Sequence, residues 1–334
     1  METNDIQKLL FQQIKITIPS NLSFAEEIAD VLNISIDSAY RRIRGEKTVS
    51  FEELQKLCIK YHLSLDQMVH ANSNATLFYG SFVDSVNFDF DKYLKDWAAN
   101  LEKINSSGTK MLYYDAKDIP LFHHYQFDHL STFKFFFWMR TILSYKEFLK
   151  MQFEDIGPTT ELHKTGLRII ETYNQIPSAE IWTFETINST LRQIEYYKES
   201  GIFRKKENIH QLYDQVTLLI DHIQDQASHG EKFMINQKPT GNKNNYRLFF
   251  NEVSTGHNTV LTETDGIQTV FLNHGVMNYM ITHDKKFCDF TKQSLENTMA
   301  KSSLISSVSE KERNRYFIVL HKKITDLKND LVFM

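Results

Sequence analysis

The residues with the clearest chemistry lie close together near the N-terminus, in the segment 35–47. Its polar and charged side chains of interest are Ser35, Asp37, Ser38, Tyr40, Arg41, Arg42, Arg44 and Lys47. An arginine guanidinium can donate two parallel hydrogen bonds to a guanine edge, and arginine, lysine and hydroxyl groups all bind phosphate oxygens. This combination is typical of a surface that binds double-stranded DNA.

A helix over residues 35–44 would position these side chains. The hydroxyl of Ser35 is a suitable N-cap, and Gly45 can end the helix. At 100° per residue, the apolar residues that share its inward side are Ile36, Ala39 and Ile43. The residues turned outward are Asp37, Ser38, Arg41 and Arg44, with Tyr40 and Arg42 on the flanks. The pattern therefore predicts one basic face on a helix whose opposite face is packed.

A second short helix precedes this one and would pack against it. Ser23 and Glu26 have the spacing of a capping box, and an apolar stripe follows at Phe24, Ile28 and Leu32. The helix is expected to stop at Asn33, which tolerates the left-handed conformation that a tight turn requires. Two helices separated by about three residues form a helix-turn-helix.

Three further short helices complete this region. The first has an apolar face of Ile6, Leu10 and Ile14. Ser50 and Glu53 predict the cap of another, whose inward stripe is Phe51, Leu54, Cys58 and Tyr61. A fifth helix is expected to start at residues 64–67, SLDQ. Five short helices within about 70 residues predict a compact all-α domain.

The segment 28–35, IADVLNIS, followed by Ser38-Ala39-Tyr40-Arg41 and Arg44-Gly45, resembles the phage-repressor type of helix-turn-helix, the XRE or Cro family. The resemblance covers roughly the first fifth of the chain. It implies that Ala29 lies where the two helices cross and that Ser35 starts the recognition helix. It also implies that Ser38, Tyr40 and Arg41 contact bases or phosphates. Two positions depart from the family: Asn33 replaces a usual glycine, and Ile36 replaces a polar residue that commonly contacts DNA.

Two alternatives to DNA binding remain for this region. Residues 1–70 hold eight Lys/Arg and ten Asp/Glu, a balance of 8 − 10 = −2, so DNA affinity must come from a local basic face rather than from net charge. The arginine cluster could instead be a solvated face of a packed helical domain. A third interpretation is a helix-turn-helix that binds protein.

The rest of the chain holds only fragments of catalytic and metal-binding patterns. Histidines at 123, 124 and 129 lie near Asp128, but no HExxH motif or nearby cysteine accompanies them, so structural histidines are expected. The aromatic run 133–138 is expected to be a buried helix. Glu252, Glu263 and Asp265 fit strand and turn positions better than an acid/base set.

Phosphate-binding and nucleophile motifs are also missing from the sequence. It contains neither a GxSxG elbow, a Walker-type glycine loop nor a GxGxxG motif, and it has only 11 glycines. We therefore expect no enzyme activity, no cofactor, no catalytic residues and no metal site.

Element patterns divide the body into two parts. Helical spacing of apolar residues runs over 88–104, 129–153, 182–197 and 209–226. After the polar stretch 236–245, the segments 246–253 and 259–273 are rich in β-branched and aromatic residues. Asp265-Gly266 predicts a type I′ hairpin turn, and a turn at 254–258 would make a three-stranded antiparallel meander. Helices are expected again at 284–299 and after Ser309.

These boundaries predict the organisation of the chain. It is a helix-turn-helix domain over 1–70, a linker over 71–77, a helical domain over 78–235, and an α+β region over 236–334 with the meander. The expected fold class is mainly α: a five-helix repressor-like head, a long helical body, and a small antiparallel β-meander near the C-terminus. We call residues 1–77 the head and residues 78–334 the body.

The sequence predicts a cytoplasmic transcription regulator. Two isolated cysteines fit a reducing compartment, and there is neither a secretory signal nor an apolar run of about 20 residues. Its expected partners are double-stranded DNA and a second copy, with a body that dimerises and/or senses a small-molecule or protein effector. The alternative is an intracellular enzyme or signalling protein whose head recruits a partner.

Overall fold

The chain divides into two compact units, Met1–Leu77 and Phe78–Met334. The computed structural model describes residues 3–18, 23–61, 63, 76–80, 88–242, 245–253, 257–275 and 277–330. The predicted fifth helix at 64–67 and most of the predicted linker 71–77 lie outside these residues. Each unit has an apolar core of its own.

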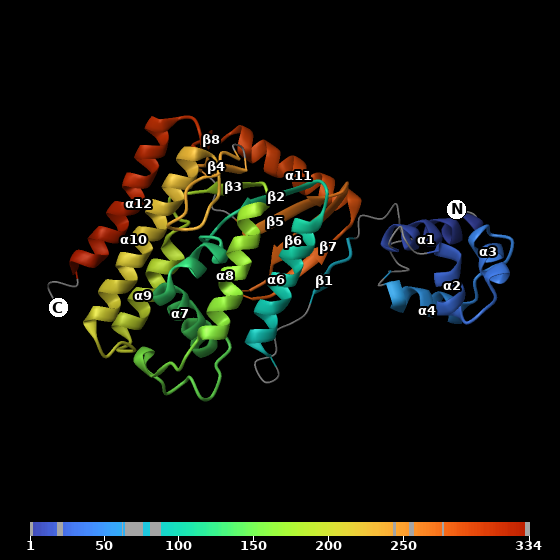
Figure 1. The fold of residues 1–334 in the computed structure, drawn as a ribbon, viewed down its shortest axis with the longest axis horizontal. Coiled ribbons are helices and arrows are strands. Elements are labelled where there is room, and N and C mark those ends of the chain that lie inside the picture. Colours follow the sequence, from blue (N-terminus) through green and yellow to red (C-terminus); the bar gives the residue numbers. More distant parts are fainter. Residues whose placement is uncertain are drawn as a thin grey trace. The chain divides into compact units, whose positions relative to one another are not determined.

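The head contains four described helices, α1 Thr3–Thr17, α2 Phe24–Leu32, α3 Ile36–Ile43 and α4 Phe51–Tyr61 (Figure 1). They enclose a small apolar core of Leu10, Phe11, Ile14, Ile28, Ala29, Leu32, Ala39 and Leu57. The apolar stripes predicted on α1 and α2 supply most of this core. The helix-turn-helix arrangement of α2 and α3 is therefore confirmed as local structure.

The inward face of α4 differs from the prediction at its start. Phe51 was expected to point inward, but its side chain is 81% exposed, whereas Leu57 is fully buried. Leu54, Cys58 and Tyr61 do pack against the core, as expected. Phe51 is the first residue of α4, directly after the Ser50 cap, and its side chain reaches solvent rather than the core.

The body is built on one mixed sheet. Within the described residues it has eight strands in the order β1-β7-β6-β5-β2-β3-β4-β8. Their bounds are β1 Tyr79–Gly80, β2 Lys110–Asp115, β3 Ser178–Trp182, β4 Tyr246–Phe250, β5 Thr259–Thr264, β6 Ile267–Asn273, β7 Tyr279–Thr282 and β8 Ser303–Leu304. The pairs β2/β3 and β3/β4 are parallel, and the other neighbours are antiparallel.

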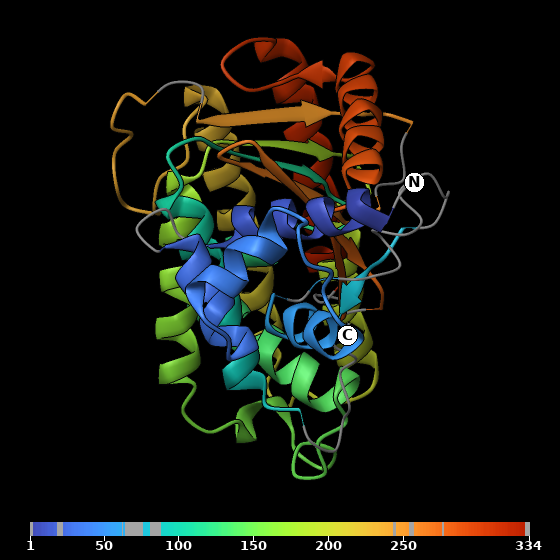
Figure 2. The ribbon, with the colours of Figure 1, turned by 90° about the vertical axis from the view of Figure 1, so that its right-hand side faces the viewer.

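Helices cover both faces of this sheet. They are α6 Phe90–Ser106, α7 Asp128–Phe137, α8 Thr160–Gln175, α9 Asn188–Glu199, α10 Lys206–His229, α11 Lys285–Ala300 and α12 Glu310–Asp330. Helix α11 packs on one face through a small cluster that includes Cys288 and Leu295. Figures 1 and 2 show α11 on the opposite side of the strands from the green and yellow helices α7 to α10.

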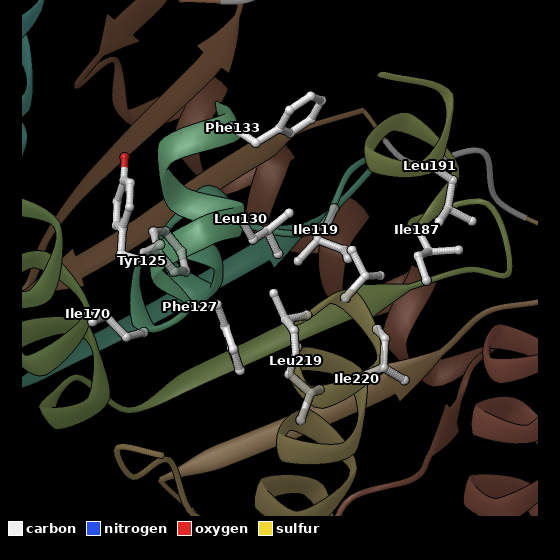
Figure 3. Packing of buried hydrophobic residues seen from close by; sticks show 14 of the residues in the cluster. Ile119, Tyr125, Phe127, Leu130, Phe133, Ile170, Ile187, Leu191, Leu219 and Ile220 are labelled. Carbon is white, nitrogen blue, oxygen red and sulfur yellow. The ribbon is translucent and has the colours of Figure 1, made fainter. Parts of the chain in front are cut away.

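The main core lies between the sheet and this larger group of helices. It is rich in aromatic side chains, and the predicted buried helix over 133–138 lies at its centre. Figure 3 shows side chains from several helices converging there, among them Leu130, Ile170, Leu191 and Leu219. Burial of this apolar surface is the main contribution that stabilises the body.

The prediction of a long helical body with a terminal meander is wrong in part. The chain is mainly helical, but β2 and β3 arise from the range expected to be helical, and β4 pairs with β3 and β8. In the predicted meander β4 would lie beside β5, whereas β2 and β3 separate them. Every residue of β3 is buried, so the alternation that marks a half-buried strand is missing from its sequence. Strands from 78–235 and from 236–334 share this sheet, so residue 235 is not a boundary between units.

One hairpin was predicted correctly. β5 and β6 pair in antiparallel register from Thr259↔Leu272 to Thr264↔Ile267. Their turn residues, Asp265 and Gly266, have φ values of 48° and 83°, as a type I′ turn requires. Part of the other expected turn, residues 254–256, lies outside the described residues. Across the part of the chain that the structure describes, none of the helices has the length and apolar character needed to cross a bilayer.

Candidate functional site

The turn between α2 and α3 has the predicted geometry. Asn33 adopts the left-handed conformation, with φ 56° and ψ 52°, and its N–H and that of Ile34 bond to the carbonyls of Asp30 and Ala29. Ser35 is the N-cap of α3, and its Oγ accepts a hydrogen bond of 3.3 Å from the Ser38 N–H. Ser23 occupies the N-cap position of α2, but its side chain makes no capping hydrogen bond. The turn thereby fixes the direction in which α3 leaves α2.

The outward face of α3 carries most of the predicted basic residues. Arg41 and Lys47 are exposed, and neither side chain has a hydrogen bond or an ion pair within the described residues. Arg44 is also exposed and forms a surface pair with Glu46, with Nε 2.9 Å from Oε1. Asp37 is exposed and lies in the first turn. The face therefore offers two cations without protein partners and a third in an exposed pair.

The remaining predicted contact residues on this helix differ in exposure. Ser35 is exposed, Ser38 is half-buried, and the Tyr40 ring is 48% exposed. Ile36, expected to pack inward, is 46% exposed, while Ala39 one turn later is fully buried against α2. Ile36 lies in the first turn of α3, one turn before the buried Ala39, and about half of its surface remains in solvent. An apolar side chain thus stands beside the basic face.

Arg42 is not part of this surface, which corrects its predicted position on a flank. Its side chain is about 4% exposed, and its guanidinium donates to both Glu53 oxygens, with Nε–Oε2 at 2.9 Å and Nη2–Oε1 at 2.6 Å. Its Nη1 also donates to the Ser38 carbonyl at 3.1 Å. The bond from Arg42 lowers the pKa of Glu53 below its ordinary value. The bidentate pair links α3 to α4 and removes Arg42 from solvent.

Glu53 and Gln7 hold α3 in place. The sequence predicted only the capping role of Glu53 and gave no role to Gln7. Glu53 forms the predicted capping box with Ser50, through reciprocal bonds of 3.0 and 3.2 Å, in addition to binding Arg42. The amide of Gln7 on α1 donates to the carbonyls of Arg42 and Lys47 at 2.7 and 2.8 Å, and accepts from the Val49 N–H at 3.0 Å. These bonds fix the loop that follows α3. Only the polar type of Gln7 on an otherwise apolar helix face hinted at this role.

The three histidines of the segment 123–129 each contact other residues of the body. His123 lies 3.1 Å from Glu180, and His124 bonds Thr190 and the Leu121 carbonyl at 3.2 and 3.1 Å. His129 bonds a backbone carbonyl in the first turn of α10. Among the described residues, no group of three or more His, Cys, Asp or Glu side chains is placed to hold a metal ion.

The acids of the β5–β6 region are dispersed rather than paired with each other. Glu263 forms an ion pair of 2.7 Å with Lys292 on α11, and Glu252 lies 3.2 Å from Arg315 on α12. The Asp265 carboxylate accepts a bond of 2.8 Å from the Thr109 N–H. Each acid therefore joins neighbouring elements of the fold.

A buried polar centre lies between the sheet and the helices, and no sequence pattern pointed to it. Glu180 on β3 is fully buried and accepts from Trp182 Nε1 at 2.7 Å, from the Tyr246 hydroxyl at 3.2 Å and from the Tyr173 hydroxyl. Burial alone would raise the pKa of Glu180, but His123 and the hydroxyl donors hold it below its ordinary value. The Glu180 carboxylate is closed to solvent and is held by donors from several elements of the body.

Comparison with known proteins gives one match. A family model described as BetR domain matches residues 5–80, which include α2, α3, α4, β1 and all of α1 except its first two residues. No curated protein and no solved structure matches the chain.

Proposed function

We propose that the head binds double-stranded DNA through α3 and that the protein is a sequence-specific transcription regulator of the XRE or Cro type. The observation that carries the proposal is the exposed, unpaired Arg41 on a helix fixed to α2 by an αL turn and a buried alanine. Such a helix fits the B-DNA major groove, where an arginine fork can donate to a guanine. Ser38, Tyr40, Arg44 and Lys47 are then placed for base or phosphate contacts.

The proposal includes a second copy of the chain and a cytoplasmic location. A symmetric dimer would place two α3 helices in successive major grooves, about 34 Å apart or a multiple of that distance. The body then dimerises and/or senses an effector that changes the DNA-binding equilibrium. The two free cysteines, Cys58 and Cys288, are compatible with a reducing compartment.

Site selection from random duplex DNA tests the proposal directly. The full-length protein is expected to enrich one motif, with two half-sites if it dimerises. Arg41→Ala should weaken binding to that motif by about 1–3 kcal/mol and relax base preference at one position. Lys56→Ala is the matched control, since Lys56 is an exposed cation on α4, away from α3. A selection that enriches no sequence, or equal losses in both variants, would contradict the proposal.

Recruitment of a protein partner by the head is the second candidate function. Exposed apolar side chains on the head favour it, namely Ile36, Tyr40, Phe51 and Ile59. Large exposed apolar side chains are typical of protein-binding surfaces rather than of phosphate contacts. Under this alternative, Phe51→Ser would abolish function in the cell, whereas Arg41→Ala would not.

A further inference from the structure

A hollow of about 510 Å³ opens beside the carboxyl ends of β2 and β3. Lys117 and Asp118 follow β2, Glu185 follows β3, and Arg192 and Gln193 come from α9. In sheets with parallel strands, ligands commonly bind outside the carboxyl ends of the strands. The volume lies within the range of small-molecule sites.

A buried lysine lies directly behind one wall of this hollow. Lys134 on α7 is 4% exposed, and its Nζ donates to Gln193 Oε1 at 2.8 Å and to Thr190 Oγ1 at 2.9 Å. Both acceptors are neutral, and no carboxylate lies within ion-pair distance of the ammonium among the described residues. Burial lowers the pKa of Lys134 to about 7, against the opposing charge of Asp118. Protonating a buried amine that has no counter-ion is costly, and a bound anion would offset that cost.

The neighbouring histidine adds neither a counter-charge nor a second cation. His124 Nδ1 can only donate to the Leu121 carbonyl, so its Nε2 accepts from the Thr190 hydroxyl, and the ring is neutral. Burial, followed by the charge of Lys134, lowers the pKa of His124 well below its ordinary value. The Thr190 oxygen is then free to accept from Lys134. The network is ordered by neutral groups, and none of them neutralises the ammonium.

The rim of the hollow has free positive charge but engaged negative charge. Glu185 bonds Lys323 at 3.4 Å and the Asn188 amide, and Asp118 accepts from the Asn258 amide at 3.3 Å. The side chains of Lys117 and Arg192 have no protein partner in the part of the chain that the structure describes. Glu185 is offset by Lys323, whereas Asp118 keeps its negative charge, so Lys117 and Arg192 are the cations of the rim that can attract an anion.

Helix α9 strengthens this preference. Its first turn, Asn188 and Ser189, lines the hollow, and its N-cap, Ile187, supplies no side-chain bond. The Asn188 N–H already donates to the Glu185 carbonyl at 2.9 Å, so this helix end acts mainly through its partial charge. A helix N-terminus carries a partial positive charge and unpaired donors that favour anions. The N-terminus and Lys134 act on the same space from two different elements.

Two other features of the body lack the donors that this hollow offers. Lys232 is equally buried, but its Nζ has three acceptors, the Tyr173 and Ile176 carbonyls and Ser178 Oγ, so all its donors are used. A larger hollow of about 770 Å³ lies on the outer side of α12, lined by Arg315 and Ile318 among others, with no buried polar group behind it among the described residues. Neither feature has buried donors available to a ligand.

We propose that the hollow between the end of β2 and the start of α9 binds a small molecule through an anionic group, a carboxylate or a phosphate. Arg192 and Lys117 contact the anion from the rim, and Lys134 donates from behind, directly or after Gln193 turns aside. A role for this ligand as an effector rests on the proposed DNA-binding function, whereas ligand binding itself does not.

Thermal unfolding of the full-length protein tests the site without DNA. The probes are inorganic phosphate, ribose 5-phosphate and succinate, each at up to about 50 mM and compared with sodium chloride at equal ionic strength. Phosphate and carboxylate salts stabilise proteins generally by exclusion from the surface, so the readout is the difference between variants. We expect at least one probe to raise the unfolding midpoint more in the wild type than in the Lys117→Ala/Arg192→Ala double variant.

Matched variants make the outcome decisive. Lys117 and Arg192 are exposed, so their replacement should leave the fold intact. The control is Lys311→Ala/Lys322→Ala, which removes two exposed cations from α12 and should respond as the wild type does. Titration calorimetry with the best probe should show a loss of affinity of about tenfold or more in the site variant. Lys134→Met should weaken binding of the same probe. If Lys134→Met does not fold, the result for Lys117→Ala/Arg192→Ala alone tests the proposal.

The two phosphate probes and succinate separate the two anion classes. Stabilisation by the phosphates alone assigns the site to phosphate esters, and stabilisation by succinate alone assigns it to carboxylates. The proposal would be overturned if every probe shifted the unfolding midpoint equally in the wild type, the site variant and the control variant. It would also be overturned if no probe shifted the midpoint more than sodium chloride does. Neither result would bear on DNA binding, which the site selection measures independently.

Discussion

Charged side chains at the centre of the body and on α3 differ in burial and in their partners. Glu180 is fully buried, and His123, Trp182 and two tyrosine hydroxyls surround its carboxylate. On α3, Arg41 is at the surface with no protein partner within the described residues. A buried charge without partners is costly, whereas an exposed, unmatched charge costs little and remains available to a ligand. For Glu180 and Arg41, matching separates a residue that holds the fold from a residue that can bind.

Arg42 shows that this distinction follows burial and not sequence position. It is adjacent to Arg41, yet its guanidinium is matched by Glu53 in the same way that Glu180 is matched by its donors. The arginine cluster 41–44 is thus divided between a structural and a surface role. Substitutions on each side of that division should have effects of very different size.

The largest effect is expected at the closed centre. Glu180→Gln keeps the shape of the side chain but removes the charge that His123 and the hydroxyl groups surround. Because it leaves buried partners unmatched, it should lower the free energy of unfolding by about 3–5 kcal/mol, measured by chemical denaturation. Glu263→Gln, which breaks a partly exposed pair with Lys292, should cost less than about 1 kcal/mol. Similar losses of unfolding free energy in Glu180→Gln and Glu263→Gln would contradict the expected difference between a buried and a partly exposed carboxylate.

A smaller but clear effect is expected at Arg42. Arg42→Ala breaks a bidentate bond to Glu53 and leaves that carboxylate half-buried, so the head should lose about 1.5–3 kcal/mol. Hydrogen exchange of the amides in α3 and α4 measures this loss locally. Arg41→Ala should change the same exchange rates by less than about 0.5 kcal/mol. If Arg41→Ala loosened α3 as much, the surface assignment of Arg41 would be wrong.

Acidification should weaken the same link in the wild type. The folded-state pKa of Glu53 is lowered, first by its bond to Arg42, so the stabilisation is fully present above the ordinary pKa of 4.5 and is lost as pH falls through the folded-state value. Exchange protection of α3 and α4 should therefore fall below about pH 4.5. Arg42→Ala should have a flatter dependence over that window, and equal slopes would show that other groups are responsible.

The smallest effect is expected at the helix caps. Ser35→Ala removes the Oγ bond to the Ser38 N–H and should cost about 0.5–1 kcal/mol, since the bond is long at 3.3 Å. Ser23→Ala is the matched control, because the Ser23 side chain makes no capping bond. Exchange in the first turns of α2 and α3 reports both changes. A larger cost at Ser23 would contradict the assigned capping geometry.

The head could be predicted from sequence because its signals are local. Capping residues, an αL asparagine and helical stripes each act within a few residues, and α1 to α4 follow them. What failed there depends on distant partners. Arg42 is buried because Glu53 lies 11 residues away, and Ile36 is exposed because the neighbouring helix ends its contact at Ala39. Gln7 acts across 35 to 42 residues.

The body was predicted less well because its strands pair at long range. β2 pairs with β5, more than 140 residues away, and β3 is buried on both faces, so neither carries a pattern that single-sequence periodicity detects. The site beside β2 and α9 has the same origin. Lys134 lies in an aromatic run that reads as core, and its contact with Gln193 spans 59 residues. The Lys134 ammonium therefore lies behind the wall of the hollow only once the chain is folded.

The two ends of the sheet have a consequence for how copies of this protein can associate. Both edge strands, β1 and β8, are two residues long, and each pairs with its neighbour through two residues. Within the described residues, edge strands this short give a foreign chain little backbone on which to continue a ladder, a common safeguard against aggregation. The proposed dimer would then form through side chains rather than by extension of the sheet.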